Sequence, residues 1–222
     1  VVAQVRDPEG AGGRAEVVVT VIPTDAPTAE ILSPLDNSSY YSDQLISFSA
    51  TVQDAEDAPE DLVLTWSSSI DGELSIDALP DSTGNVDDAG YLSEGEHFVT
   101  LLVLDSSGKS VEESVVVTVG GPNGDPLCEI TSPPTNSAAS LGQTVIFEGT
   151  ASDPDVSSDD LAVMWSSDKD GELGSGSITS SGELSLPVSD LSASTHTITL
   201  RVEDELGESC SDAIIFSVGT PP

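Results

Sequence analysis

Basic residues are scarce in this chain of 222 residues: five Lys and Arg stand against 40 Asp and Glu, a formal net charge of −35 at pH 7. Nucleic acid is excluded as a partner, because phosphate binding needs clustered Lys and Arg. The same repulsion argues against direct docking on, or insertion into, an anionic membrane. So large a charge strains a compact fold, and bound divalent cations or high salt would relieve that strain; the alternative is that the charge serves solubility alone.

Aromatic residues and helical periodicity are also scarce. Phe, Trp and Tyr make up 4% of the chain, so a core must be built from Val, Ile and Leu. These residues fall in short runs separated by Gly, Pro, Asp and Ser, which favours strands over helices. An apolar run of about 20 residues that could cross a membrane is missing. Val1 starts within a repeated pattern, without Met or a signal peptide, so we expect a piece of a longer protein.

The chain instead contains a long internal repeat. The stretch WSSSIDGEL begins at Trp66 and WSSDKDGEL begins at Trp165, an offset of 165 − 66 = 99. The same offset aligns the two halves without a gap, and so long a period indicates tandem globular modules rather than a solenoid. Residues that coincide at this offset include Glu30 and Glu129, Gln44 and Gln143, Phe48 and Phe147, His97 and His196, and Gly108 and Gly207.

The repeat also predicts the domain boundaries. We expect two complete modules at residues 28–120 and 127–219, with Pro-rich linkers at 23–27 and 121–126. Residues 5–21 match residues 103–119 at an offset of 98, so residues 1–22 are expected to be the final hairpin of a preceding, partial module. Residues 220–222 would begin the next linker.

Each module shows about seven short runs in which apolar and polar residues alternate. With one Trp on the third run, they predict an all-β protein of tandem immunoglobulin-like β-sandwiches, with Trp66 and Trp165 in the cores. In the second module the runs lie near residues 127–132, 143–152, 160–168, 172–178, 182–188, 195–204 and 210–218.

The motif WSSxxDGEL, followed by HxxTLxVxDxxG and a Val-rich last strand, resembles the PKD-like repeats of bacterial and archaeal cell-surface proteins. The resemblance covers both complete modules and the leading hairpin. It departs from the family at the usual Trp-Asp-Phe-Gly-Asp-Gly stretch, which here reads Trp-Ser-Ser-x-x-Asp-Gly, so the subfamily stays open. The resemblance implies spacer and adhesive modules of exported proteins.

The two cysteines, Cys128 and Cys210, both lie in the second module, and their counterparts in the first are Ala29 and Val111. One copy has both cysteines and the other has neither, as expected if the two cysteines act as a pair. The first and last strands can be neighbours in an immunoglobulin-like sandwich, so we expect a disulfide and an oxidising, extracellular location. The alternative is two buried free thiols.

Catalytic constellations are not convincing in this sequence. His97 and His196 occupy equivalent strand positions, where a buried structural role outweighs a catalytic one. Paired carboxylates such as Asp170 and Glu172 share one turn, whereas glycosidase acids flank a cleft from separate elements. Asp168-x-Asp170-Gly171 resembles the start of an EF-hand loop but lacks its bidentate Glu, so we interpret Asp-Gly as a hairpin turn. We therefore predict a segment that is not an enzyme.

Calcium is the sharper hypothesis, because it takes six to eight oxygen ligands and acidic residues recur at one end of each module. The loops between the second and third strands and between the sixth and seventh lie at the same end as the entering linker. The pattern resembles cadherin-like junctions, where calcium stiffens a joint; the alternative is that Asp residues cap turns. The candidate ligands are Asp25, Asp54, Glu56 and Asp105 in the first module and Asp125, Asp153, Asp155 and Asp204 in the second.

We expect a non-catalytic segment of a large exported surface protein, acting as a stalk or adhesive spacer. Its partners would be other modules of the same chain, a surface glycan or protein, or further copies in a filament. One alternative is a polysaccharide-binding or spacer region of a secreted hydrolase, for which Tyr40, Tyr41 and Tyr91 are the candidate aromatic platform. Another is a subunit of an extracellular filament joined by donated strands. Asn37-Ser38-Ser39 is a glycosylation sequon.

Overall fold

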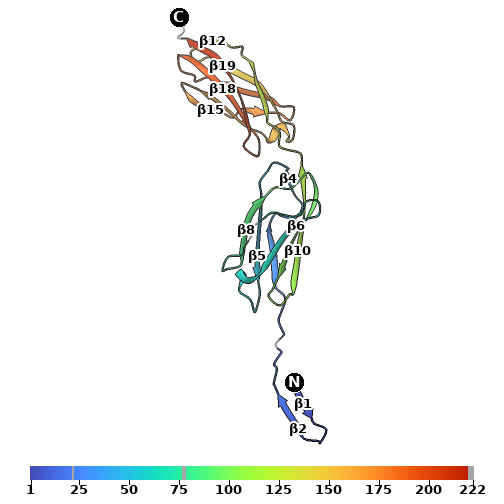
Figure 1. Ribbon diagram of the computed structural model, residues 1–222. Helices are drawn as coiled ribbons and strands as arrows, with labels where there is room; N and C mark the ends of the chain where they lie inside the picture. The colour runs from blue at the N-terminus through green and yellow to red at the C-terminus, as the bar shows by residue number, and fades with distance from the viewer. Residues whose placement is uncertain (22, 77–78, 220–222) are drawn as a thin grey trace. The chain divides into compact units, whose positions relative to one another are not determined.

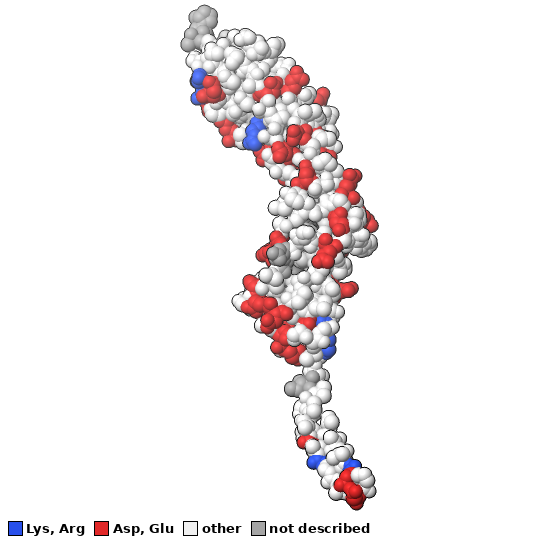
Figure 2. Space-filling model, viewed as in Figure 1, with Lys and Arg blue, Asp and Glu red and all other residues white. Residues whose placement is uncertain are grey.

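The computed structural model describes residues 1–21, 23–76 and 79–219 and confirms the all-β prediction (Figure 1). The chain forms two compact units, Val1–Pro122 and Asn123–Pro222, and each is described by itself below. Figure 2 shows Asp and Glu side chains over the surface of both, with few Lys or Arg among them.

The first module is a sandwich of two sheets. One sheet has the strand order β4-β10-β9-β6-β7, and the other has the order β3-β5-β8. Neighbouring strands are antiparallel except β4 and β10, which run parallel. The strands are β3 (Thr28–Ser33), β4 (Ser38–Tyr41), β5 (Ile46–Gln53), β6 (Val63–Ser68), β7 (Gly72–Glu73), β8 (Asn85–Gly90), β9 (Gly95–Leu104) and β10 (Ser110–Gly120), and a short 3-10 helix, η1 (Pro59–Asp61), leads into β6.

The second module repeats this plan. Its sheets have the orders β12-β19-β18-β14-β15 and β11-β13-β17-β16, and β12 runs parallel to β19. The strands are β11 (Leu127–Ser132), β12 (Ser137–Ser140), β13 (Val145–Ser152), β14 (Ala162–Ser167), β15 (Gly171–Gly174), β16 (Ser177–Ile178), β17 (Glu183–Val188), β18 (Thr195–Glu203) and β19 (Ser209–Gly219), with a 3-10 helix, η2 (Ser158–Asp160).

Two details differ from the seven expected strands. The first strand of each module continues as a second short strand, β4 or β12, in the opposite sheet. The change of sheet follows Ser33-Pro34 and Ser132-Pro133, where Pro cannot donate to the ladder. The run expected at 172–178 is also divided, into β15 and β16 of different sheets, because Gly174 and Gly176 take positive φ (126° and 70°) and turn the chain.

The core of each module lies between its two sheets and is built around one Trp. Trp66 is 2% exposed and Trp165 is fully buried. The ring centroid of Trp66 lies 5.5 Å from that of Phe48, and the ring centroid of Trp165 lies 6.0 Å from that of Phe147. Val, Ile and Leu side chains from alternating positions of β5, β9 and β18 fill much of the rest, and β13 adds Phe147 and Ala151.

The predicted disulfide between Cys128 and Cys210 is confirmed, with a Cα–Cα distance of 5.9 Å. It joins β11, at the edge of the four-stranded sheet, to β19 of the five-stranded sheet. In the first module Ala29 and Val111 occupy these places and pack, partly buried, against the core. The bridge therefore closes one side of the second sandwich, where the first relies on apolar contact alone.

We predict that a Cys128→Ser/Cys210→Ser double variant loses stability in the second module alone. The bridge closes a loop with a sequence separation of 82, which in the chain-entropy model stabilises the fold by about 4 kcal/mol. Hydrogen exchange followed by mass spectrometry in increasing urea separates the two modules, so the first serves as the internal control. Equal losses in both modules, or none in the second, would contradict the prediction.

Residues 1–21 form a hairpin of two strands, β1 (Val2–Arg6) and β2 (Gly12–Glu16), which pair antiparallel. All of its residues are exposed. Among the described residues, none of the helices is long and apolar enough to cross a membrane.

Candidate functional site at the linker end of each module

Two buried aspartates stand at equivalent strand ends. Asp105 follows β9 and Asp204 follows β18, and they are 8% and 7% exposed. Asp105 Oδ1 accepts hydrogen bonds from the backbone N–H of Lys109 (2.8 Å) and the hydroxyl of Ser107 (2.9 Å). Asp204 Oδ1 accepts from two backbone N–H groups, both at 2.9 Å, within its own hairpin turn. Each aspartate thus fixes the turn that leads into the last strand.

These contacts keep both carboxylates ionised at neutral pH. Burial by itself raises the pKa of Asp204, but the Asn123 amide and the N–H groups of Leu206 and Glu208 outweigh it and lower that pKa below its usual value. Burial also raises the pKa of Asp105. The hydrogen bonds from the N–H of Lys109 and the hydroxyl of Ser107 outweigh this effect, so the pKa of Asp105 is lowered as well.

A second pair of aspartates lies in the loop after β5 and β13. Asp54 Oδ1 accepts from the backbone N–H groups of Glu56 and Asp57, both at 2.8 Å. Asp153 Oδ1 accepts from those of Asp155 (2.8 Å) and Val156 (3.0 Å). In both modules the other oxygen, Oδ2, is buried and has no hydrogen-bond partner within the described part of the chain. A buried carboxylate oxygen without a donor is unfavourable and calls for a water or cation partner.

The linker of the second module is hydrogen-bonded to both kinds of acid. Asn123 Nδ2 donates to Asp204 Oδ2 at 2.8 Å, and the backbone N–H of Gly124 donates to Asp155 Oδ2 at 2.7 Å. The approach is so close that a Cβ on Gly124 would lie 2.3 Å from Cγ of Pro154. The linker is thereby fixed between the strand-end acid and the loop acids.

The first module makes the same connection with other atoms. The hydroxyls of Thr24 and Ser107 lie 3.2 Å apart, and Ser107 donates to Asp105. The backbone N–H of Asp25 donates to Glu56 Oε2 at 3.2 Å. Thr24 and Asp25 are the counterparts of Asn123 and Gly124 at the offset of 99. We call this arrangement, with its strand-end acid, loop acids and linker residues, the linker-end cluster.

The candidate calcium ligands divide into two groups. The hydrogen bonds connect Asp54, Glu56 and Asp105 in the first module and Asp153, Asp155 and Asp204 in the second. Asp25 takes part through its backbone N–H, and the exposed Asp125 lies one residue beyond the contact made by Gly124. Within residues 1–21, 23–76 and 79–219, no three His, Cys, Asp or Glu side chains form a group that could hold a metal ion by themselves. A cation here would need further oxygens from carbonyls, hydroxyls, amides or water.

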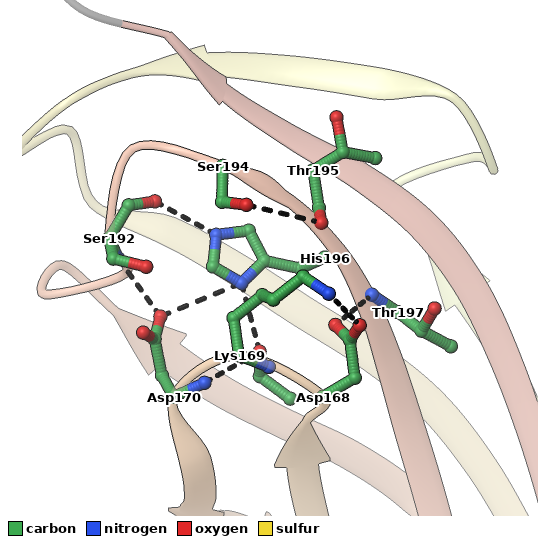
Figure 3. Close-up of polar contacts among 9 residues, drawn as sticks. Asp168, Lys169, Asp170, Ser192, Ser194, Thr195, His196 and Thr197 are labelled. Atoms are coloured by element: carbon green, nitrogen blue, oxygen red, sulfur yellow. Dashed lines mark hydrogen bonds and ion pairs between the residues drawn. The ribbon is translucent and has the colours of Figure 1, made fainter.

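A different polar network surrounds the fully buried His196 (Figure 3). His196 Nε2 lies 2.8 Å from the backbone oxygen of Ser192, so Nε2 carries the proton and donates it. Nδ1 then accepts from Ser167 Oγ at 2.9 Å, while that oxygen accepts from the N–H groups of Lys169 and Asp170. Asp170 Oδ2 accepts from the N–H of Ser192 and lies 3.5 Å from Nδ1.

The first module repeats this network around the fully buried His97. Its Nδ1 lies 2.6 Å from Ser68 Oγ and 3.7 Å from Asp71 Oδ2, and its Nε2 lies 2.6 Å from the backbone oxygen of Ser93. A hydrolytic triad places Ser and Asp on opposite ring nitrogens, whereas here both face Nδ1. Ser68 is also 5% exposed, so its hydroxyl has no route to substrate. The network is structural: its hydrogen bonds hold the β6–β7 turn against β9 and the residues that lead into it.

We predict that Ser167→Ala destabilises the second module by about 1–3 kcal/mol, because it leaves a buried acceptor and two N–H groups unsatisfied. Ser68→Ala should have the matching effect in the first module. Native-state hydrogen exchange measures each loss separately, and Ser166→Ala, a neighbour outside the network, is the control. A Ser167→Ala loss no larger than that of Ser166→Ala would contradict the assignment.

The remaining candidates from the sequence lie apart from these clusters. Tyr40 and Tyr41 are partly buried, whereas Tyr91 is 61% exposed. Tyr91 borders a shallow hollow of about 470 Å³ that also includes Glu73 and Leu74. Asn37 is exposed and its side-chain amide donates to Asp36 at 2.8 Å.

Comparison with known proteins gives the fold. No protein-family model matches the chain, and no curated protein matches its sequence. The fibronectin(III)-like modules of Clostridium thermocellum CbhA are 19% identical over 87% of this chain and 95% of theirs, with a TM-score of 0.57. The I67–I69 fragment of the titin I-band is 13% identical over 88% of this chain and 66% of that fragment, with a TM-score of 0.48. The likeness to the CbhA modules shows the fold alone, and it agrees with the tandem immunoglobulin-like sandwiches that the strand topology gives.

Proposed function

We propose that the chain is a non-catalytic stalk segment of a large exported surface protein, built from PKD-like modules that act as spacers or adhesive units. The observation that carries the proposal is the linker-end cluster. In both modules the residues that enter the sandwich are hydrogen-bonded to the same loop position, Glu56 or Asp155, and to the turn at the strand end, through Ser107 in the first module and Asp204 in the second. A free tether between independent domains would not need such contacts.

Three further features support a role outside the cell. The disulfide is stable in an oxidising compartment. The high negative charge keeps the chain soluble and opposes binding to nucleic acid. Pro residues on either side of each cluster limit the conformations open to the linker.

Antibodies against residues 28–219 test the location of the protein. They should label intact cells of the organism that makes it, and mild proteolysis of those cells should release fragments that contain one or both modules. Labelling only after permeabilisation would contradict the proposal. Binding to an insoluble polysaccharide that Tyr91→Ala abolishes would instead favour a carbohydrate-binding region, for which the hollow beside Tyr91 is the candidate surface.

We further propose that each linker-end cluster binds one calcium ion. The unpartnered Oδ2 atoms of Asp54 and Asp153 are the supporting observation, since the same oxygen is left without a donor in both modules. Calcium accepts carboxylate, carbonyl, hydroxyl and amide oxygens, so a full set of acidic side chains is not required. Asp105 and Asp204, with the linker residues beside them, would supply further oxygens, and the ion would stiffen the attachment of the linker.

We predict that millimolar calcium raises the unfolding free energy of both modules. At a concentration 100 times the dissociation constant the gain is about 2.7 kcal/mol. Asp54→Asn should abolish the gain in the first module and Asp153→Asn in the second, as resolved by hydrogen exchange. Asp168→Asn removes the same charge outside the cluster and is the control. An unchanged stability in calcium, or a response in wild type that Asp153→Asn leaves intact, would count against the site.

A further inference from the structure

The linker that enters the second module contains an Asn-Gly pair. An Asn side chain loses its amide when the backbone nitrogen of the next residue attacks its Cγ. The attack is easiest before Gly, which has no side chain to hinder the nitrogen and lets the backbone turn toward Cγ. Asn123 is followed by Gly124, whereas Asn37, Asn85 and Asn136 are followed by Ser, Val and Ser. By its sequence, Asn123 is therefore the asparagine of this chain most prone to deamidation.

This reaction needs only water and ends in a carboxylate. The Gly124 nitrogen forms a bond to Cγ of Asn123 while the bond between Cγ and Nδ2 breaks. The proton of the Gly124 N–H is passed to the leaving nitrogen, which departs as ammonia. Water then opens the five-membered succinimide at either carbonyl, which gives aspartate or isoaspartate, and the new carboxyl group loses its proton to the solvent.

In the docked linker both reacting groups are held by acids. The backbone N–H of Gly124 donates to Asp155 Oδ2 at 2.7 Å, and Asn123 Nδ2 donates to Asp204 Oδ2 at 2.8 Å. A carboxylate is too weak a base to remove an amide proton, and its charge makes the amide nitrogen harder to deprotonate. The negative charge that develops during the attack would also lie beside two carboxylates, which repel it at this range. The cluster therefore suppresses the reaction while the linker is docked.

The glycine that makes Asn123 reactive is also required for docking. A Cβ on Gly124 would lie 2.3 Å from Cγ of Pro154 and 3.0 Å from Asp155 Oδ2, so a larger residue does not fit without a shift. In the first module the counterparts are Thr24 and Asp25, which have no side-chain amide to lose. The second linker thus docks through a pair that is chemically stable only while it is docked.

We propose that Asn123-Gly124 is a self-modification site that reacts when the linker leaves the cluster, and that its deamidation keeps the linker from docking again. Asp204 is 7% exposed and accepts the Asn123 amide. A carboxylate at position 123 has no proton to donate at neutral pH, and in the absence of a cation it would repel Asp204. Isoaspartate would in addition lengthen the backbone. The reaction therefore makes a transient release of the linker permanent.

The rate of deamidation in the full chain tests the first half of the proposal. The chain is incubated at mildly basic pH, and peptide mapping that separates aspartate from isoaspartate follows all four asparagines. A chelator of divalent cations is present, so the result does not depend on the calcium proposal. In the urea-unfolded chain Asn123 should react first. In the native chain it should react about tenfold more slowly or slower still, because two hydrogen bonds to carboxylates keep the open linker to roughly one molecule in ten or fewer.

Asp155→Ala removes the acceptor of the Gly124 N–H and should raise the native rate several-fold toward the unfolded rate. Asp190→Ala removes the same charge from an exposed site outside the cluster and should leave the rate unchanged. Protection of β13 and β18 from hydrogen exchange reports that the module is folded in each variant. Equal rates in the native and unfolded chains, or equal effects of Asp155→Ala and Asp190→Ala, would overturn the proposed gating.

A variant that copies one product tests the second half. In Asn123→Asp we expect the amide proton of Gly124 to exchange several-fold faster than in the wild type, as measured by NMR with the intrinsic exchange rates taken into account. Asn136→Asp adds the same charge to the same module outside the cluster and should leave that exchange unchanged. Wild-type exchange of Gly124 in Asn123→Asp, or an equal acceleration in Asn136→Asp, would show that the product docks as well as Asn123 and would overturn this half.

Discussion

The shortage of Lys and Arg determines which groups the carboxylates of this protein can bind. With five Lys and Arg for 40 Asp and Glu, most carboxylates cannot pair with a basic side chain, and several accept hydrogen bonds from backbone N–H groups instead. Asp54, Asp105, Asp153 and Asp204 close their own loops in this way. Asp36 reaches across to the N–H of Val116 on a distant strand. Charge that would otherwise oppose folding is thus used to fix turns, and the modules hold their shape with few aromatic residues.

The sequence was sufficient for the fold because the repeat acted as an alignment of the chain with itself. Alternation of apolar residues predicted most strands within two residues, and the paired appearance of Cys128 and Cys210 predicted the disulfide. It was not sufficient for the short strands β4 and β12. Their four residues carry too little pattern, and their place depends on parallel pairing with the end of the chain segment about 80 residues away. Such non-local pairing leaves no signal in the short run itself.

The polar clusters could be predicted only in part. The strand-end and loop acids recur at one offset, and the structure joins them through the linkers. Thr24 and Asn123 were missed because their residue types differ, although their positions repeat. The hydrogen-bond networks around His97 and His196 were missed for another reason. Their Ser, Asp and His recur in both copies, but the His is separated from the Ser by about 30 residues. The side chains meet only because β6 pairs with β9, and β14 with β18. The conspicuous Trp-Ser-Ser-x-x-Asp-Gly motif is therefore a core residue followed by one half of a buried network.

The unequal distribution of cysteine gives the two modules different mechanical behaviour. When the chain is pulled at its ends, tension in the second module passes from β11 to β19 through the covalent bridge. The residues between Cys128 and Cys210, with a contour length of roughly 280 Å, cannot be drawn out unless the bond is reduced. The first module has no such limit between Ala29 and Val111 and can unravel along its whole length. Under load the pair would behave as an extensible element in series with a nearly inextensible one, and a change in redox conditions would make both extensible.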